Sequence, residues 1–236
     1  MKKTLIALAL LCAAQVSAQT VVQQFVAISR GAGTVSDMDL EPTAEGSTLI
    51  AMPFEVTPGI KVLSVTDNAP AGSNTYKEVP GSVASCSGAL LDIWYCEKCN
   101  PGVTELKFHL SGHVQMSVNT FVEVSGLQMS SVLDGEGAHV TDGPRTSDGV
   151  EVGPKITTSS NDFIIARYSS PFSVPLPTDA PAPWVFKPAY IYLLNAAPGA
   201  YTPNLTGGGT GGNYCMSVAA FRAAAPAPVP PEASQK

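Results

Sequence analysis

Short runs in which apolar and polar residues alternate, or which are wholly apolar, recur along the chain from position 20 onward. Glycine, proline, asparagine and aspartate separate these runs, and helical periodicity is almost absent beyond residue 18. We therefore predict strands at positions 20–29, 47–56, 60–67, 74–79, 89–96, 104–111, 114–127, 150–158, 162–169, 188–195 and 213–223. Strands of this number and spacing predict an all-β fold, an antiparallel β-sandwich of jelly-roll type.

The run "TFVEVSGL" at positions 120–127 illustrates the pattern. Positions 121, 123 and 125 fall on one face of a strand, and positions 122, 124 and 126 fall on the other. One face of this strand can therefore pack in the core while the other meets a second layer or water.

Two segments interrupt the strand pattern. Residues 169–188 carry six prolines, so they cannot form a central strand and are expected to form an ordered surface excursion or lid-like loop. Residues 204–212, "NLTGGGTGG", predict a flexible loop rather than a phosphate-binding loop, because neither a Lys-Ser/Thr pair nor a helix follows.

The first 18 residues have the features of a secretory signal peptide. Two lysines precede an apolar run, and small residues occupy the positions that a signal peptidase reads, which predicts cleavage after Ala18. One β-sandwich domain is expected at 19–224, followed by a disordered tail rich in proline and alanine at 225–236. We expect the mature protein to be secreted or held at the cell surface, with the periplasm as the alternative, and to have no membrane span.

The mature chain is acidic. Cleavage removes two of the 13 basic residues and leaves 11 against 19 acidic residues, a net charge of −8. This balance makes nucleic acid an unsuitable partner.

Four cysteines remain after cleavage, namely Cys86, Cys96, Cys99 and Cys215. An even number in an oxidising compartment favours two disulfides. A redox motif is disfavoured because "CEKC" runs into the turn "NPG" rather than a helix, and a zinc site would want a second close pair. Three pairings are open; we favour Cys86 with Cys96 or Cys99, and Cys215 with the remaining thiol.

Several stretches in order, "GSTLIAMPFEV", "VLSVTDNAPAGSNTY", "TFVEVSGLQMSSVLDG", "ITTSSNDFIIA" and "NYCMSVAAFRA", together resemble a known kind of module. Over about residues 46–223 the chain is similar to a jelly-roll-like β-sandwich module that recurs in secreted, often multidomain proteins of environmental bacteria. Its pattern includes S-V-T-D-x-x-G-N-T-Y, E-Y-S-G-L and a closing A-A-F. The resemblance implies an extracellular module without enzymatic activity. This chain departs from the pattern at "CEKC", in the proline-rich insertion and in the extra residues "APA".

The stretch "SVTDNAPAGSNTY" predicts a hairpin connection. Asp67 and Asn68 open a turn with side-chain to backbone hydrogen bonds, Gly72 allows a positive φ, and Asn74 begins the return strand. The alternative is a calcium site that takes oxygens from Asp67, Asn68 and Asn74, but no D-x-D-x-D run supports it.

Candidate catalytic acids were sought because glycoside hydrolysis needs two carboxylates facing a common groove. The closest pair is Asp134 and Glu136, which lie in a glycine-rich connection, while Asp142 and Asp148 lie in turn sequences. We interpret all four as loop acids. The serine-hydrolase pattern G-x-S-x-G is missing as well, so we predict that the protein is not an enzyme.

The three histidines are candidate zinc ligands. His109 and His113 flank "LSG", and a tight turn there would bring them together, whereas a contribution from His139 has no support. We interpret them as structural or exposed residues and predict no cofactor or metal.

Aromatic residues leave binding as the favoured function. Trp184 and Phe186 lie in the proline-rich excursion, and Tyr190 and Tyr201 follow it, so these four are the predicted ligand-binding residues. We expect a non-catalytic module for adhesion or for binding of a polysaccharide or cell-surface ligand. The alternatives are a self-assembling subunit of an extracellular filament or appendage and, second, a polysaccharide-degrading enzyme.

Overall fold

The computed structural model describes residues 18–170, 176–210 and 212–225. In these ranges the fold is all-β, without helices, and every pair of neighbouring strands is antiparallel. The predicted fold class, an antiparallel β-sandwich, is confirmed, while its jelly-roll connectivity stays a prediction. No helix that could cross a membrane occurs in the described ranges.

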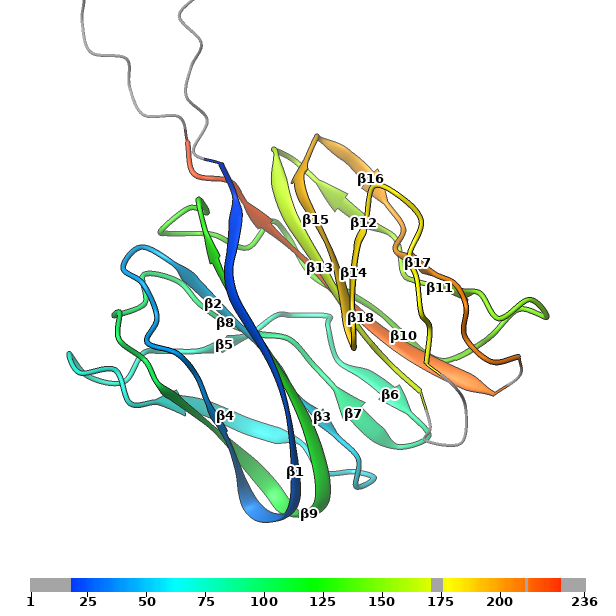
Figure 1. Ribbon diagram of the computed structural model, residues 1–236, viewed down its shortest axis with the longest axis horizontal. Helices are drawn as coiled ribbons and strands as arrows, with labels where there is room; N and C mark the ends of the chain where they lie inside the picture. Colours follow the sequence, from blue (N-terminus) through cyan, green and yellow to red (C-terminus); the bar gives the residue numbers. More distant parts are fainter. Residues whose placement is uncertain (1–17, 171–175, 211, 226–236) are drawn as a thin grey trace, which may run out of the picture.

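The first sheet curls into a half-barrel around the long strand β9 (Figure 1). Its order is β5-β8-β2-β9-β3-β7-β6, and β1 and β4 also pair with β9. The nine strands found in the described residues are β1 (Thr20–Asp39), β2 (Thr48–Met52), β3 (Phe54–Glu55), β4 (Val62–Asp67), β5 (Lys77–Glu78), β6 (Ala84–Cys86), β7 (Ala89–Leu91), β8 (Trp94–Cys96) and β9 (Glu105–Ser125).

The second sheet lies beside the first and has the order β10-β18-β13-β15-β14 (Figure 1). Its strands are β10 (Ala138–Pro144), β13 (Asp162–Ser169), β14 (Val185–Lys187), β15 (Tyr190–Ala196) and β18 (Asn213–Arg222). Two small ribbons complete the fold: β11 (Glu151–Val152) with β17 (Asn204–Leu205), and β12 (Ile156–Thr158) with β16 (Gly199–Tyr201).

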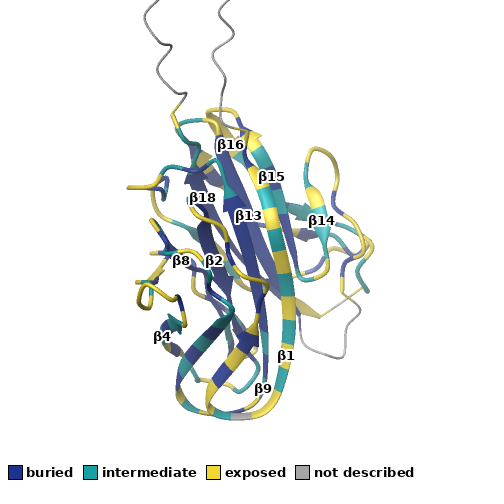
Figure 2. Ribbon diagram, turned by 60° about the vertical axis from the view of Figure 1, so that its left-hand side comes forward, coloured by how far each residue is buried: buried dark blue, intermediate teal, exposed yellow. Residues whose placement is uncertain are grey.

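The second sheet is covered on both faces, which explains its continuous apolar sequence. All eight residues of β13 are buried. Phe163 and Ile165 face the first sheet, where they meet Val122. Ile164 and Ala166 point the other way, into a cluster formed with the outer ribbons and the residues around β14. Figure 2 shows β13 buried along its length and β18 buried except at its two ends, whereas β1 alternates between intermediate and exposed positions over residues 20–30.

A single strand, β9, replaces the two strands predicted at 104–111 and 114–127. The turn expected at "LSG" is wrong, because β9 continues through Gly112 as one strand. Its pairing with β1 is irregular there, since Val35 pairs with His109 and Gly33 with Val114. His109 and His113 therefore lie on the same strand rather than on the two sides of a hairpin turn. Instead, His109 Nε2 lies 2.9 Å from Thr66 Oγ1.

The four cysteines form two disulfides, but not in the favoured pairing. Cys86 on β6 bonds to Cys215 on β18, with Cα atoms 5.3 Å apart, and so ties the two sheets together. Cys96 bonds to Cys99 within the turn after β8. The sequence could not indicate the first bond because its cysteines are 129 positions apart and meet only when the sheets stack.

The turn at Asp67 is confirmed, but its role as a hairpin is not. Asp67 Oδ1 accepts hydrogen bonds from the backbone N–H groups of Ala69 and Asn74, and Gly72 has φ 110°. The following strand, β5, pairs with β8 instead of returning along β4. Asp67 Oδ2 accepts from the Asn74 amide and the Tyr76 hydroxyl, so both carboxylate oxygens are already used inside the turn.

The remaining segment predictions meet the structure only in part. Almost all of the predicted signal peptide and tail lies outside the described residues, as do 171–175 of the proline-rich excursion. The described part of that excursion contains β14, which pairs with β15 at the edge of the second sheet. In the predicted glycine-rich loop, Asn204 and Leu205 form β17.

Candidate functional site

The four aromatic residues predicted to bind a ligand do not form one surface. Trp184, Phe186 and Tyr201 are partly buried against the outer cluster of the second sheet, and the rings of Phe186 and Tyr168 stack with centroids 6.1 Å apart. Tyr190 points to the opposite face, towards the first sheet, and is only 1% exposed. Its ring is therefore not an exposed platform for sugar stacking. The ligand-binding role of all four residues stays a prediction.

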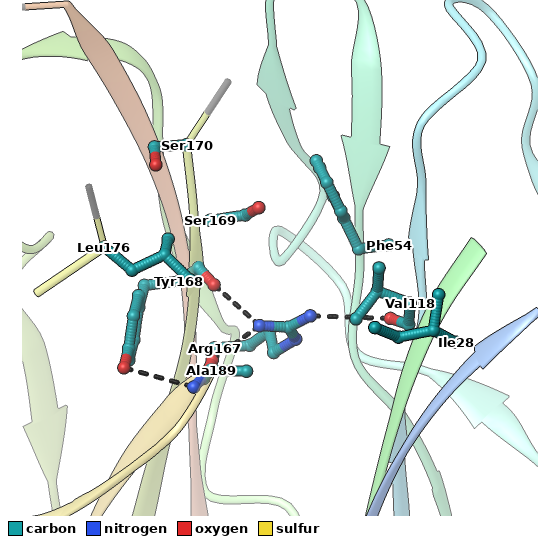
Figure 3. A pocket seen from close by; sticks show the side chains of 9 residues that line it. All are labelled: Ile28, Phe54, Val118, Arg167, Tyr168, Ser169, Ser170, Leu176 and Ala189. Atoms are coloured by element: carbon teal, nitrogen blue, oxygen red, sulfur yellow. Dashed lines mark hydrogen bonds between the residues drawn. The ribbon is translucent and has the colours of Figure 1, made fainter. Parts of the chain in front are cut away.

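An apolar cavity of about 260 Å³ opens between the two sheets (Figure 3). The first sheet contributes Ile28 from β1, Phe54 from β3 and Val118 from β9. The second sheet and its neighbouring segments contribute Arg167, Tyr168, Ser169, Ser170, Leu176 and Ala189. We call this space the Arg167 cavity, because that side chain is the only charged group among the described residues that line it.

Strand alternation carries Arg167 into this cavity. On β13, Phe163, Ile165 and Arg167 share the face that looks at the first sheet. Arg167 thus occupies the next position of this face after Phe163 and Ile165, at the place where the cavity lies between the two sheets. Its side chain is 2% exposed, so it does not extend into solvent as a strand-end arginine ordinarily does.

The Arg167 guanidinium is held only by backbone carbonyls. Nη1 donates to the carbonyl oxygens of Tyr168 at 2.7 Å and Ala189 at 2.6 Å, and Nη2 donates to that of Val118 at 3.4 Å (Figure 3). Nε is buried and has no hydrogen-bond partner in the described part of the chain. The Nε–H is therefore a buried donor of a charged group that no acceptor in the described residues satisfies.

No carboxylate in the described ranges faces Arg167. The contrast with Arg145 is direct, because that arginine is also buried but forms an ion pair with Glu151, whose side chain is fully buried too. Burial lowers the pKa of Arg167 to about 10, so the group remains charged at neutral pH. An unpaired buried charge of this kind costs several kcal/mol, on the order of what an ionic partner could offset.

A second hollow of about 240 Å³ lies beside the Arg167 cavity along β1. It is lined by Gln24, Phe25 and Val26 of β1 and by Lys187, Pro188 and Tyr190. The Tyr190 hydroxyl hydrogen-bonds the side-chain oxygen of Gln24 across the opening. We call this space the Tyr190 hollow. Both spaces thus open between β1 and the edge of the second sheet.

Two other buried carboxyl groups, Glu55 and Asp92, lie on the concave side of the first sheet. Both oxygens of Glu55 are buried without a partner, while Asp92 accepts a hydrogen bond of 2.9 Å from Trp94 Nε1. Burial, reinforced by Asp92, raises the pKa of Glu55 to about 8, and burial raises that of Asp92 to about 7. Asp92 reaches a small cavity of about 150 Å³, but Glu55 is only 1% exposed and does not line it. Glu55 therefore holds a proton in the interior without access to a substrate.

Three of the four acids weighed as catalytic candidates, Asp134, Asp142 and Asp148, have structural partners. Asp134 accepts hydrogen bonds from the backbone and hydroxyl of Ser159 and forms an ion pair of 2.7 Å with Arg222. Asp142 Oδ1 accepts from the backbone N–H of Ser87, and Asp148 accepts from the Thr146 hydroxyl.

Metal-ligating side chains do not gather in the described residues, where no group of three or more histidine, cysteine, aspartate or glutamate side chains could hold a metal ion. His139, the third histidine considered, hydrogen-bonds the carbonyl oxygen of Gly81 at 2.9 Å.

No protein-family model, curated protein or solved structure was found to match this chain. The resemblance drawn from its sequence patterns therefore stays a prediction, and function has to be argued from the geometry.

Sequence reasoning missed Arg167 altogether. The available signal was a single charged residue inside the apolar run "DFIIARYS". A charged side chain in a buried strand is costly unless hydrogen-bond or ionic partners compensate its loss of water, so the arginine in this run marked a position of interest.

Proposed function

We propose that this protein is an extracellular, non-catalytic binding module that works in adhesion or surface recognition. In this proposal its ligand places a carboxylate in the Arg167 cavity. The observation that carries the proposal is the buried guanidinium of Arg167, which has an unpartnered Nε and no acidic partner in the described chain.

The chemistry of the cavity favours a carboxylate attached to an apolar body. A carboxylate in the cavity would neutralise the charge of the guanidinium, and charge-assisted hydrogen bonds are about twice as strong as neutral ones. Ile28, Phe54 and Val118 give the rest of the cavity an apolar wall, so a ligand that fills it also removes apolar surface from water. An extracellular setting is supported by the two disulfides, which are typical of proteins that fold in an oxidising compartment.

The test is a titration of the folded protein with acetate, isobutyrate and benzoate, each compared with its amide. The Nε–Hε resonance of Arg167 in the NMR spectrum is the direct readout. We expect a saturable shift with the carboxylates and none with the amides. A resonance that does not move at any carboxylate concentration would overturn the proposal.

Substitutions add a second readout. Arg167→Gln should abolish the carboxylate-dependent rise in thermal stability, whereas Arg30→Gln, an exposed arginine on β1, should leave it unchanged. The titration of the wild-type chain decides the matter even where Arg167→Gln folds poorly.

Sugar stacking by Trp184 is a separate proposal for the same module. It is supported by the partial exposure of this ring on the outside of the second sheet. The wild-type protein should be retained on an insoluble polysaccharide, and Trp184→Ala should abolish this retention. Equal retention of the variant and the wild type would contradict the proposal.

A further inference from the structure

The edge of the first sheet beside the Arg167 cavity is free. β1 pairs only with β9, so its other edge has no strand partner in the described residues. From residue 23 to residue 30 the register with β9 is regular, without a bulge. This stretch therefore presents an even row of unpaired backbone N–H and C=O groups.

Between residues 23 and 29, a stretch flanked by register shifts, the free edge of β1 also lacks the features that normally protect an edge strand. Positions 20–29 contain no proline, no glycine and no charged residue. The other edge strands carry such features: β5 is two charged residues, β6 and β14 have three residues each, β4 and β10 contain register shifts, and β10 ends at a proline. Because long unprotected edges invite pairing, β1 is the edge of this fold suited to accept another strand.

The side chains of β1 connect this edge to both spaces. Val26 lines the Tyr190 hollow and Ile28 lines the Arg167 cavity, and both side chains lie on the same face of β1. They are 46% and 61% exposed, unusually high values for apolar side chains at the mouth of a core. Alternate side chains on a strand are about 7 Å apart, so a strand added to β1 would direct two alternate side chains over the two openings.

We propose that the ligand is an extended polypeptide segment that adds to the outer edge of β1 as a new strand and places an acidic side chain in the Arg167 cavity. This inference rests on the proposed function, of which it names the partner. The residue two positions away enters the Tyr190 hollow, whose lining of Phe25, Val26 and Pro188 suits an apolar side chain. The recognised pattern is thus an acidic residue and an apolar residue separated by one position.

Charge argues against a second copy of the chain as the added strand. Positions 20–30 contain no aspartate or glutamate, so pairing of this stretch with itself brings no carboxylate to Arg167. In this proposal the added strand is therefore a different polypeptide, which supplies the negative charge that self-pairing of this stretch lacks.

The test uses fluorescent synthetic peptides of about ten residues, long enough to form one strand. Their threonine-rich sequence contains Glu-Thr-Leu or Leu-Thr-Glu at the centre and lysines at both ends. The first order fits an antiparallel strand and the second a parallel one. We expect one of them to bind at least about tenfold more tightly than its glutamine counterpart, because the glutamate forms a buried charged hydrogen bond.

Two controls separate strand addition from simple carboxylate binding. Methylation of the backbone nitrogens that face β1 should abolish binding, because it removes the donors to the edge while keeping the glutamate. On the protein, Ile28→Asn should weaken binding several-fold, whereas Leu63→Asn should not, since Leu63 is equally exposed, at 62%, but lies on β4.

The outcomes separate the two proposals. Suppose that acetate shifts the Arg167 resonance. If the methylated peptide then binds as well as the unmodified one, or if neither peptide binds more tightly with glutamate than with glutamine, strand addition is wrong and the proposed function stands. If neither carboxylates nor peptides move the resonance, both fall. Concentration-dependent self-association that buries β1 and excludes the peptides would also overturn strand addition, because a second copy would then occupy the edge.

Discussion

Replacement of Glu55 by glutamine should make the protein more stable at neutral and mildly alkaline pH. Both carboxyl oxygens of Glu55 are buried without a hydrogen-bond partner. Burial, with a smaller contribution from the charge of Asp92, raises the pKa of Glu55 from its ordinary value of 4.5 to about 8. The folded chain therefore keeps a proton on this group at a pH where the unfolded chain has lost it.

The sign of the effect follows from linkage. Below pH 4.5 both states are protonated, and the group then contributes its full stability. Between that value and about 8 the folded state binds one proton more, so the free energy of unfolding falls by about 1.4 kcal/mol per pH unit. From about pH 5 to about pH 8 the loss from Glu55 alone is on the order of 4 kcal/mol. Glutamine copies the protonated form at every pH and removes this loss.

Urea unfolding of the oxidised protein, followed by tryptophan fluorescence, measures the effect. At about pH 5 Glu55→Gln should match the wild type within about 1 kcal/mol, and at about pH 8 it should be more stable by a few kcal/mol. Glu45→Gln is the control, because Glu45 is exposed and should leave the slope with pH unchanged. Parallel curves for Glu55→Gln and the wild type over this range would refute the reasoning.

Three further predictions concern the disulfides, the hydrogen bonds of the Asp67 turn and calcium. Replacement of Cys86 and Cys215 by serine should lower the free energy of unfolding by about 5 kcal/mol, and replacement of Cys96 and Cys99 by about 2 kcal/mol. These values follow from the loop-closure entropies for sequence separations of 129 and 3. Urea titration compares the two double variants, and equal losses of stability would contradict the loop-closure argument. Asp67→Ala removes four hydrogen bonds and should cost about 2–4 kcal/mol in the same assay. Calcium or EDTA should leave the wild-type melting temperature unchanged, and a rise with calcium would restore the metal interpretation of this turn.

The sequence predicted the strands well where local pattern decides the structure. The buried strand β13 was visible in "DFIIARYS", and the turn at Asp67 was visible in its side-chain chemistry. It failed where distant segments decide. Gly112 indicated a turn, yet β9 continues through that position, between the residues paired with β4, which end at Leu110, and the next residue paired with β1, Val114. The Cys86–Cys215 bond likewise depends on how β6 meets β18, which no local pattern encodes.

The candidate site was less predictable than the fold. Aromatic residues were chosen by type and by their proximity to a proline-rich segment, but the face on which a side chain lies depends on sheet packing. Tyr190 and its neighbour Ile191 point to opposite sides of the second sheet, and only the stacking of the sheets makes the Tyr190 side internal. Arg167 required the same knowledge, because its cavity exists only between segments that are distant in sequence.

Glu55 and Arg167 are both buried without an ionic partner in the described residues, and their chemistry explains why the proposed ligand is placed at Arg167. Phe54, which lines the Arg167 cavity, is followed on β3 by Glu55, and adjacent side chains on a strand point to opposite faces, so the two groups are separated by the first sheet. A buried carboxyl can relieve its desolvation by keeping a proton, and with a pKa of about 8 Glu55 is mostly neutral at pH 7 without any partner. The guanidinium of Arg167 cannot become neutral in this way, because even a pKa of about 10 leaves it charged at pH 7. Only Arg167 therefore retains a charge that an external carboxylate can neutralise.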